Sequence, residues 1–188
     1  MNLRKDRILG IDPGTNILGF GILEFNNNQS KVLDCNVIHL NSHEDHQTKL
    51  KEIFLQIQEI IETYHTGIMS IEMPFYGKNA QSMLKLGRAQ GVAMAAGMIM
   101  GVEIHEFSAK KIKKAVTGNG NSSKEQVADM LMRILNYKID SKYLDASDAL
   151  GAAFCYTSQN KLPIKGAKGD PKSWSGFMAA HPDRIVKL

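Results

Sequence analysis

Long apolar runs are missing from this chain of 188 residues. No stretch reaches the roughly 18 to 20 consecutive apolar residues that span a bilayer. The first residues, MNLRKDRILGID, lead into a strand-like segment without a cleavable apolar leader. We therefore expect a soluble cytoplasmic protein that has no membrane partner.

Cysteine is equally scarce, because only Cys35 and Cys155 occur, both in apolar surroundings and without a paired spacing. Disulfide frameworks and thiolate metal sites need several cysteines at characteristic separations. Neither kind of site is expected here, and we predict that both residues are reduced members of the core.

Positive charge is present but unevenly distributed over a chain of net charge +4. Residues 1–160 carry 17 basic and 17 acidic residues, so the excess lies in residues 161–188, with six basic and two acidic groups. Residues 71–124 hold eight basic against three acidic residues, whereas residues 1–70 hold six against nine. Such an asymmetry allows a polyanion to dock on one face and be repelled by another. A solvated, lysine-rich surface is an equally open interpretation.

Hydropathy patterns predict three strands first, followed by alternating helices and strands. The strand-like segments are ILGIDPGT from Arg7, NILGFGILEF, SKVLDCNVIHL, IMSIEMP and VEIHEF. Helical spacing or helix-start signals mark residues 46–64, 79–100, 108–116 and 124–135, and a last helix from about Asp145. The order indicates an α/β fold with a mixed five-stranded sheet flanked by helices. Residues 1–160 are predicted to form one domain, and residues 161–188 a basic, flexible tail.

Two acidic residues occupy unusual positions in the predicted strands. Asp12 ends the first strand before a Pro-Gly turn, which leaves its carboxylate at the strand's open end, although a turn role is the commoner one for such an aspartate. Glu72 lies inside IMSIEMP with apolar neighbours, where an unpaired carboxylate is unfavourable or has a shifted pKa. For Glu72 we favour a functional site over an ion-paired or edge-strand position.

A second acidic pair opens the last predicted helix. Asp145 and Asp148 are three residues apart, so both project from one side of its start. A structural role is open to them, with Asp145 as N-cap and Asp148 favourable to the helix dipole. If the four acids meet at one end of the sheet, they offer the hard oxygen donors that Mg²⁺ prefers. Two such ions activate water and stabilise the leaving oxygen in phosphodiester hydrolysis.

Four strings in this order resemble the bacterial RuvC family of Holliday junction resolvases: ILGIDPGTN, IEMPFYGKNAQSMLKLGRAQGVAM, TGNGNSSKEQVADML and DASDAL. They cover residues 8 to about 158, and the second string is the most specific. The resemblance implies a ribonuclease H-like fold, a homodimer, two Mg²⁺ ions per active site with Mn²⁺ as a substitute, and paired nicks across four-way junction DNA. It implies a partnership with the RuvA–RuvB branch-migration complex. It assigns catalysis and metal binding to Asp12, Glu72, Asp145 and Asp148.

The same resemblance implies which residues contact DNA. Phe75 matches the family's aromatic residue beside the catalytic glutamate, which stacks on a base where the junction opens; from the residues alone, a core phenylalanine is the first interpretation. Lys113 and Lys124 match lysines that reach phosphates near the scissile bond. The other predicted DNA contacts are lysines that by themselves would be read as a solvated surface: Lys78, Lys110, Lys111 and Lys114.

The segment 79–100 carries a stripe of small residues at Gly87, Gly91 and Ala95. Packing of this stripe on the sheet and packing at a dimer interface explain it equally, so the homodimer rests mainly on the resemblance. Because the segment has little charge after Arg88, we expect the helix to be covered on most sides.

Two features stay outside the predicted site. His39, His43 and His46 surround a polar loop without helical spacing, so we expect surface residues rather than a metal cluster. The tail holds the only tryptophan, Trp174, and could fold on DNA, pack on the body or contact a partner.

Three rival functions remain to be distinguished. An actin-like phosphotransferase would use Asp12, Gly14 and Thr15 as a phosphate loop, but it needs two domains and a second such loop, for which 188 residues are too few. A DNA-binding module without catalysis leaves Glu72 unexplained. A ribonuclease H-like nuclease with another nucleic-acid substrate, such as an RNA/DNA hybrid, would share the fold and the metals.

Overall fold

The computed structural model describes residues 2–27, 29–41, 43–74, 79–139 and 144–159. Its strands are β1 (Arg4–Asp12), β2 (Ile17–Asn26), β3 (Gln29–His39), β4 (Thr66–Glu72) and β5 (Glu103–Phe107). Its helices are α1 (His46–Tyr64), α2 (Ala80–Ile99), α3 (Ala109–Thr117), α4 (Lys124–Leu135) and α5 (Leu144–Gln159). Among them, no helix is both long and apolar enough to cross a membrane.

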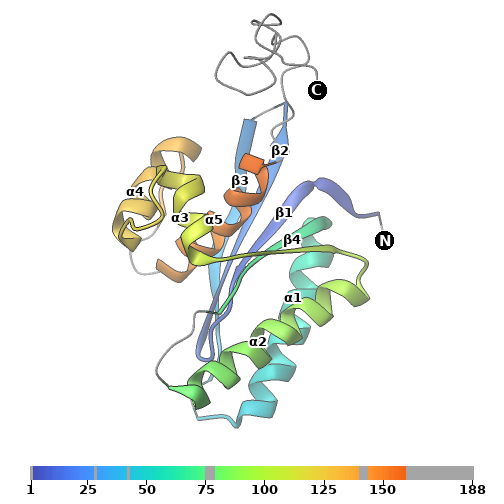
Figure 1. Ribbon diagram of the computed structural model, residues 1–188. Helices are drawn as coiled ribbons and strands as arrows, with labels where there is room; N and C mark the ends of the chain where they lie inside the picture. The colour runs from blue at the N-terminus through green and yellow to red at the C-terminus, as the bar shows by residue number, and fades with distance from the viewer. Residues whose placement is uncertain (1, 28, 42, 75–78, 140–143, 160–188) are drawn as a thin grey trace, which may run out of the picture.

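The strands form one mixed sheet in the order β3-β2-β1-β4-β5 (Figure 1). β1 pairs antiparallel with β2 and parallel with β4, and β4 pairs parallel with β5. The predicted α/β class and mixed five-stranded sheet are therefore confirmed. β1 begins at Arg4, three residues earlier than the hydropathy pattern suggests, because its start is polar and Arg4 is held by hydrogen bonds to Asp6 and Glu24.

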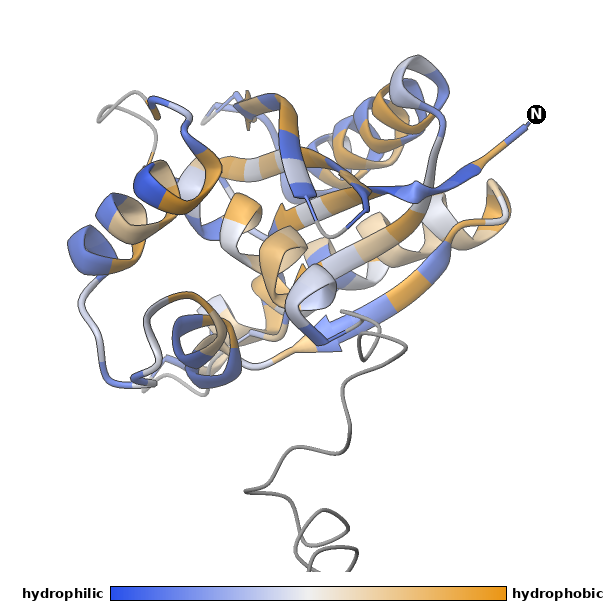
Figure 2. Ribbon diagram, turned by 90° about the horizontal axis from the view of Figure 1, so that it is seen from above, coloured by the Kyte–Doolittle hydropathy of each residue, from blue (hydrophilic) through white to orange (hydrophobic). Residues whose placement is uncertain are grey.

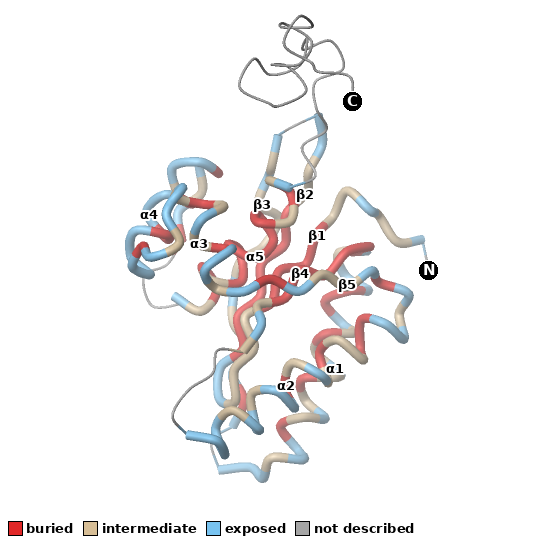
Figure 3. Tube along the Cα trace, viewed as in Figure 1, coloured by how far each residue is buried: buried red, intermediate tan, exposed pale blue. Residues whose placement is uncertain are grey.

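Alternate residues of the strands face two different cores. In β1, Leu9 and Ile11 pack with α1 and α2, whereas Ile8 packs with α4 and α5, as the two-residue period of a strand requires. In Figure 2 the apolar sides of the helices turn toward the sheet. Figure 3 shows burial concentrated in the strands and in α5, most of which is enclosed. Of the two cysteines predicted to lie in the core, Cys155 is buried and Cys35 is half-buried.

Two glycines allow α5 to lie directly on the sheet. A Cβ atom on Gly10 of β1 would stand 2.0 Å from the carbonyl oxygen of Ala149, and one on Gly19 of β2 would stand 2.0 Å from that of Asp145. The hydroxyl of Ser70 in β4 donates a hydrogen bond of 2.5 Å to the carbonyl of Ala152 in α5. The backbone of α5 is therefore held against three neighbouring strands.

The small-residue stripe of α2 does not pack on the sheet. Cβ atoms added to Gly87 or Gly91 would meet nothing within 4 Å, and the buried positions of α2 are instead Ala89, Ala93, Ala96 and Gly97. The interpretation of the two glycines as sheet contacts is therefore wrong. The expectation that α2 is covered on most sides also fails within one chain, because three of its large apolar side chains are exposed: Leu84, Met98 and Ile99.

We predict that Gly10→Ala destabilises the fold, since its methyl group would overlap the α5 backbone. Overpacking of this kind costs about 1–3 kcal/mol, measured as the free energy of unfolding in urea. Gly87→Ala is the matched control at protein concentrations where the chain is monomeric, because within one chain the added methyl group has open space and alanine favours a helix by up to about 1 kcal/mol. Equal stability of Gly10→Ala and the wild type would show that α5 is not fixed by this contact.

Candidate active site

Strand register places Asp12 and Glu72 side by side. Ile11 of β1 is the partner of Ile71 in the parallel strand β4, so the next residue on each strand is an acid. Adjacent strands lie only about 4.8 Å apart. Asp12 and Glu72 are 60 positions apart in sequence, yet each ends its strand at the same end of the sheet.

Helix α5 brings the second acidic pair to this end of the sheet. The cross-strand partner of Asp12 is Gly19, the glycine against which the Asp145 carbonyl packs. Carboxylate oxygens of Asp12, Asp145 and Asp148 all lie within 4.8 Å of one another. Because α5 begins at Leu144, Asp145 lies inside its first turn, and the alternative that Asp145 is the N-cap is wrong.

Burial and mutual repulsion disfavour negative charge in this cluster. Burial, and then the neighbouring charges of Glu72 and Asp148, raise the pKa of Asp12 to about 8. Burial and then Asp148 raise the pKa of Glu72 to about 7. The pKa of Asp148 is also raised, chiefly by burial. Glu72 lies outside the tight group of three, but it shares their electrostatic field.

Two lysines predicted from the family pattern lie beside these acids. Lys124, the first residue of α4, donates a hydrogen bond to Asp148. Burial opposes the charge on Lys124, but the pairing with Asp148 and the field of Asp12 raise its pKa overall. Lys113 donates to the carbonyl of Ser122 at 2.8 Å, and its charge lowers the pKa of both Glu72 and Asp148.

The remaining predicted DNA contacts differ in their positions. Lys110 joins Lys113 in lining a cavity of about 530 Å³ beside Met73 and Pro74, directly after Glu72. Lys111 instead lies over the ring of Phe107, 4.8 Å from its centroid. Lys114 is exposed in the last turn of α3, where a positive charge suits the helix dipole. Phe75 and Lys78 lie outside the described residues, as does the tail with Trp174.

The loop between α3 and α4 holds Lys113 in place, which the sequence analysis missed. The Thr117 hydroxyl donates to the Lys113 carbonyl at 2.9 Å and shares a hydrogen bond of 2.8 Å with the Ser122 hydroxyl. Ser122 is buried although it lies in a polar loop. The run TGNGNSS is rich in side chains that bond to nearby backbone, and this was the signal that could have identified a rigid loop.

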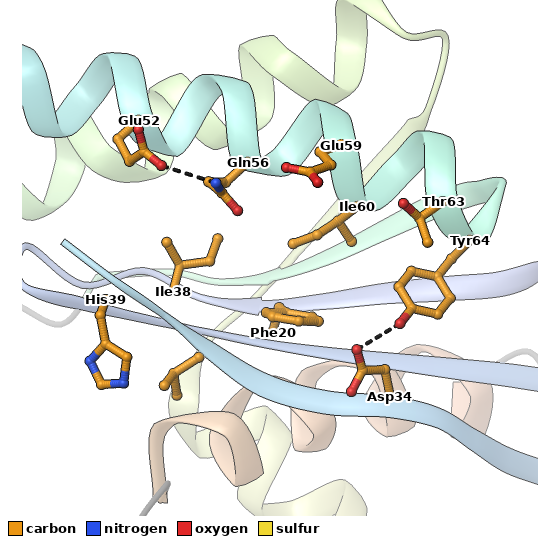
Figure 4. A pocket seen from close by; sticks show the side chains of 11 residues that line it. Phe20, Asp34, Ile38, His39, Glu52, Gln56, Glu59, Ile60, Thr63 and Tyr64 are labelled. Carbon is orange, nitrogen blue, oxygen red and sulfur yellow. Dashed lines mark hydrogen bonds between the residues drawn. The ribbon is translucent and has the colours of Figure 1, made fainter.

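A separate groove, on the side of the sheet that α1 covers, carries the reverse charge. It has a volume of about 390 Å³ between α1 and the edge strand β3, and Asp34, Glu52 and Glu59 line it (Figure 4). Asp34 accepts a hydrogen bond of 2.7 Å from the hydroxyl of Tyr64. None of the predicted site residues that the structure describes lines this groove, and its charge disfavours a polyanion. The acidic lining of the groove agrees with the excess of acidic over basic residues in residues 1–70.

The donor set of the carboxylate cluster fits a hard divalent cation. Asp12, Asp145 and Asp148 contribute oxygen ligands, which suit Mg²⁺ and Mn²⁺, and neither cysteine belongs to the group. Carboxyl groups with raised pKa values so close together are destabilising in themselves and become favourable when a cation neutralises them.

We predict a pH-dependent gain in stability for Asp12→Asn in chelator-containing buffer. The carboxyl has a pKa near 4 in an unfolded chain and about 8 in the folded one. The folded state therefore retains a proton that the unfolded state loses, and wild-type stability falls as the pH rises from about 4 to about 8. The melting temperature of Asp12→Asn relative to wild type should rise across this window.

The control is Asp129→Asn, which removes an exposed acid from α4 and so accounts for the general loss of one negative charge. A melting temperature for Asp12→Asn below that of wild type at pH 8 would instead indicate that Asp12 is stabilised by its surroundings.

Comparison with known proteins gives matches over most of the chain. The family model for crossover junction endodeoxyribonuclease RuvC matches residues 8–156. A protein of that name from Cytophaga hutchinsonii is 50% identical over 178 residues, which cover 95% of this chain and 87% of the relative. Another, from Christiangramia forsetii, is 50% identical over 186 residues, covering 97% of this chain and 95% of the relative.

Solved structures agree in fold. RuvC from Thermus thermophilus has a TM-score of 0.73 at 24% identity, covering 81% of this chain and 93% of that one. The same protein in complex with a Holliday junction substrate has a TM-score of 0.72 at 23% identity, covering 81% and 92%. These likenesses confirm the ribonuclease H-like architecture. With the family model and the two relatives, they lead to one conclusion: the chain belongs to the RuvC family of crossover junction endodeoxyribonucleases.

Proposed function

We propose that this chain is a structure-specific endonuclease that resolves Holliday junctions by paired, symmetric nicks in homologous recombination and DNA repair. The observation that carries the proposal is the cluster of Asp12, Asp145 and Asp148 beside Glu72 in a member of a nuclease family. The relatives are named crossover junction endodeoxyribonucleases, and one structural neighbour was solved with a junction substrate. We extend that activity and that substrate to this chain.

The four carboxylates would hold two Mg²⁺ ions, or Mn²⁺, which favours the same oxygen donors. When bound, such ions lower the pKa of a water molecule to give the nucleophile and stabilise the leaving oxygen of the phosphodiester. The chain itself contributes the positions of the four carboxylates. Asp12 and Glu72 end two paired strands, and Asp145 and Asp148 project from the start of a buried helix. Such elements hold ligands more rigidly than loops do.

Lys113 and Lys124 are suited to hold the phosphate beside the carboxylates. Both already act on the acidic cluster, Lys124 through its hydrogen bond to Asp148 and Lys113 through its field at Glu72. When the carboxylates engage other cations, these ammonium groups are available to donate to phosphate oxygens. Lys110 extends the same basic surface beside Met73. Base stacking by Phe75 and a contact from Lys78 stay predictions from the family pattern.

A homodimer suits both the substrate and the exposed side of α2. Leu84, Gly87, Gly91 and Met98 follow one another at helical spacing and form a single outward stripe. Exposed Leu84 and Met98 would be buried by a second copy, and the glycines would permit close approach of its backbone. A two-fold dimer presents one cluster to each of two symmetric strands. Partnership with the RuvA–RuvB complex is retained as a prediction from the family.

We expect Asp12→Asn to abolish cleavage of a synthetic four-way junction while junction affinity stays within a few-fold of wild type. The reason is that the carboxylate serves metal chemistry and the lysines serve affinity. The assay compares the junction with linear duplex and with an RNA/DNA hybrid, with and without Mg²⁺, and Asp129→Asn is the control. Normal nicking by Asp12→Asn would contradict the proposed site, and preferential cutting of the hybrid would favour a ribonuclease H activity.

We expect the combined change Lys113→Ala and Lys124→Ala to weaken junction binding and reduce its salt dependence. Each lost phosphate contact lowers the slope of log affinity against log salt by about 0.9, so the double variant should lose up to about 1.8. Lys31→Ala, which removes an exposed lysine from β3, is the control. An unchanged slope would mean that neither lysine contacts phosphate.

A further inference from the structure

A second basic cavity lies on the face of the sheet covered by α1 and α2. It has a volume of about 410 Å³, and its walls come from the turn after β1 and from the first turns of the two helices. Its lining is rich in hydrogen-bond donors: Thr15, Asn16, His46, Lys49, Ser82 and Lys85. Neither the family resemblance nor the proposed catalytic site accounts for it.

Lys49 is the most informative residue in this cavity. It is only 9% exposed, and the Nζ atom donates a hydrogen bond of 2.7 Å to the side-chain oxygen of Asn16. Among the described residues no acid forms an ion pair with it. A buried charge normally requires an opposite charge, so the ammonium group of Lys49 retains the capacity to bind an anion.

Other charges around the cavity add to the positive field. Lys85 lines it, and Lys85 and Arg88 are both exposed on α2. Burial and then the charges of Arg88, Lys85 and Lys49 lower the pKa of His46, while Asp45 opposes them. Asp45 itself is the N-cap of α1 and accepts a hydrogen bond from the backbone N–H of Thr48. Glu44 is the acid that lines the cavity.

His46 departs from the sequence-based expectation of a surface residue. Its side chain is half-buried, and its Nε2 atom is inaccessible and has no hydrogen-bond partner among the described residues. Neither α1 nor α2 has an acidic residue in its first turn, but the Asp45 cap offsets part of the positive end of α1, so the N-terminus of α2 is the less compensated of the two. The N-terminus of α2 favours a bound anion, whereas the enclosed Nε2 atom of His46 is not available to one.

The cavity also lies close to the proposed catalytic edge, by which we mean the end of the sheet that carries Asp12 and Glu72. Thr15 follows Asp12 by three residues, so their Cα atoms are at most roughly 11 Å apart. One nucleotide advances a duplex strand by about 3.4 Å along its axis, so this distance corresponds to about three nucleotides. Figure 1 shows the β1–β2 turn and the starts of α1 and α2 at the same end of the molecule.

We propose that this cavity binds a backbone phosphate of a junction arm through Lys49 and Lys85. The inference rests on the proposed function and adds a contact on the side of the sheet opposite to α3 and α4. Lys113 and Lys124 would hold the DNA from one side of the catalytic edge, and Lys49 and Lys85 from the other. The ligand is a phosphodiester, which basic side chains recognise without regard to base sequence.

Junction affinity at several salt concentrations tests the proposal, using full-length protein and a synthetic four-way junction with a chelator present to prevent cleavage. Lys85→Ala should weaken binding at low salt several-fold and lower the salt slope by about 0.9. Equivalently, a fourfold rise in salt should weaken its binding about 3.5-fold less than it weakens wild-type binding. Lys49→Met keeps the aliphatic stem of the side chain. It should cause a similar loss of affinity and a similar decrease in the salt slope.

Glu44→Gln is expected to increase junction affinity, which misfolding of the variant would not do. Removing the acid from the cavity should tighten junction binding about two- to threefold at low salt. Lys51→Ala is the matched negative control, because Lys51 is an exposed lysine of α1 outside the cavity. Melting temperatures of all variants check the fold, and if Lys49→Met is unstable, the exposed positions Lys85 and Glu44 decide the outcome.

The inference is overturned if Lys85→Ala and Glu44→Gln both bind with the affinity and salt slope of wild type. If this happens while the wild type binds and cuts junctions, the proposed function stands and only the second contact is wrong. If the wild type neither binds nor cuts junctions, the proposed function and the inference fail together.

Discussion

The close approach of α5 to the sheet is the contact on which the acidic cluster depends. Gly10 and Gly19 leave room for the carbonyls of Ala149 and Asp145, which any side chain would displace. Because Gly19 is the cross-strand partner of Asp12, this contact also fixes the distance between the acids of β1 and α5. A helix held about one side chain farther away would separate the carboxylates.

The same closeness makes the cluster electrostatically unfavourable when no cation is bound. Burial raises the pKa of Asp12, Glu72 and Asp148, and the acids add to the effect by repelling one another. Lys124 relieves part of this repulsion through its hydrogen bond to Asp148. Stability alone does not favour such an arrangement, whereas a site that binds divalent cations requires it.

Charge is divided over the molecule in a way that suits one elongated polyanion. The groove beside β3 is acidic, whereas basic residues lie on both sides of the catalytic edge, from α3 and α4 on one face of the sheet and from α1 and α2 on the other. The acidic groove favours correct orientation, since long-range fields steer DNA away from it. The exposed apolar side chains of α2 agree with the proposed homodimer.

The sequence by itself determined most of the elements and the mixed sheet, and it marked four acids at strand and helix ends as a predicted site, because hydropathy periods, turn residues and acids at such positions are local signals. It could not determine which side of α2 is buried, since both faces of that helix are apolar. Only packing in the folded chain buries Ala89 and leaves Gly87 facing open space. Lys49 was also missed, although it precedes Ile53 by four residues on the buried side of α1. Its significance depends on the lack of an acidic partner within the described part of the chain, and that is decided by residues brought together from the β1–β2 turn, α1 and α2 only when the chain is folded.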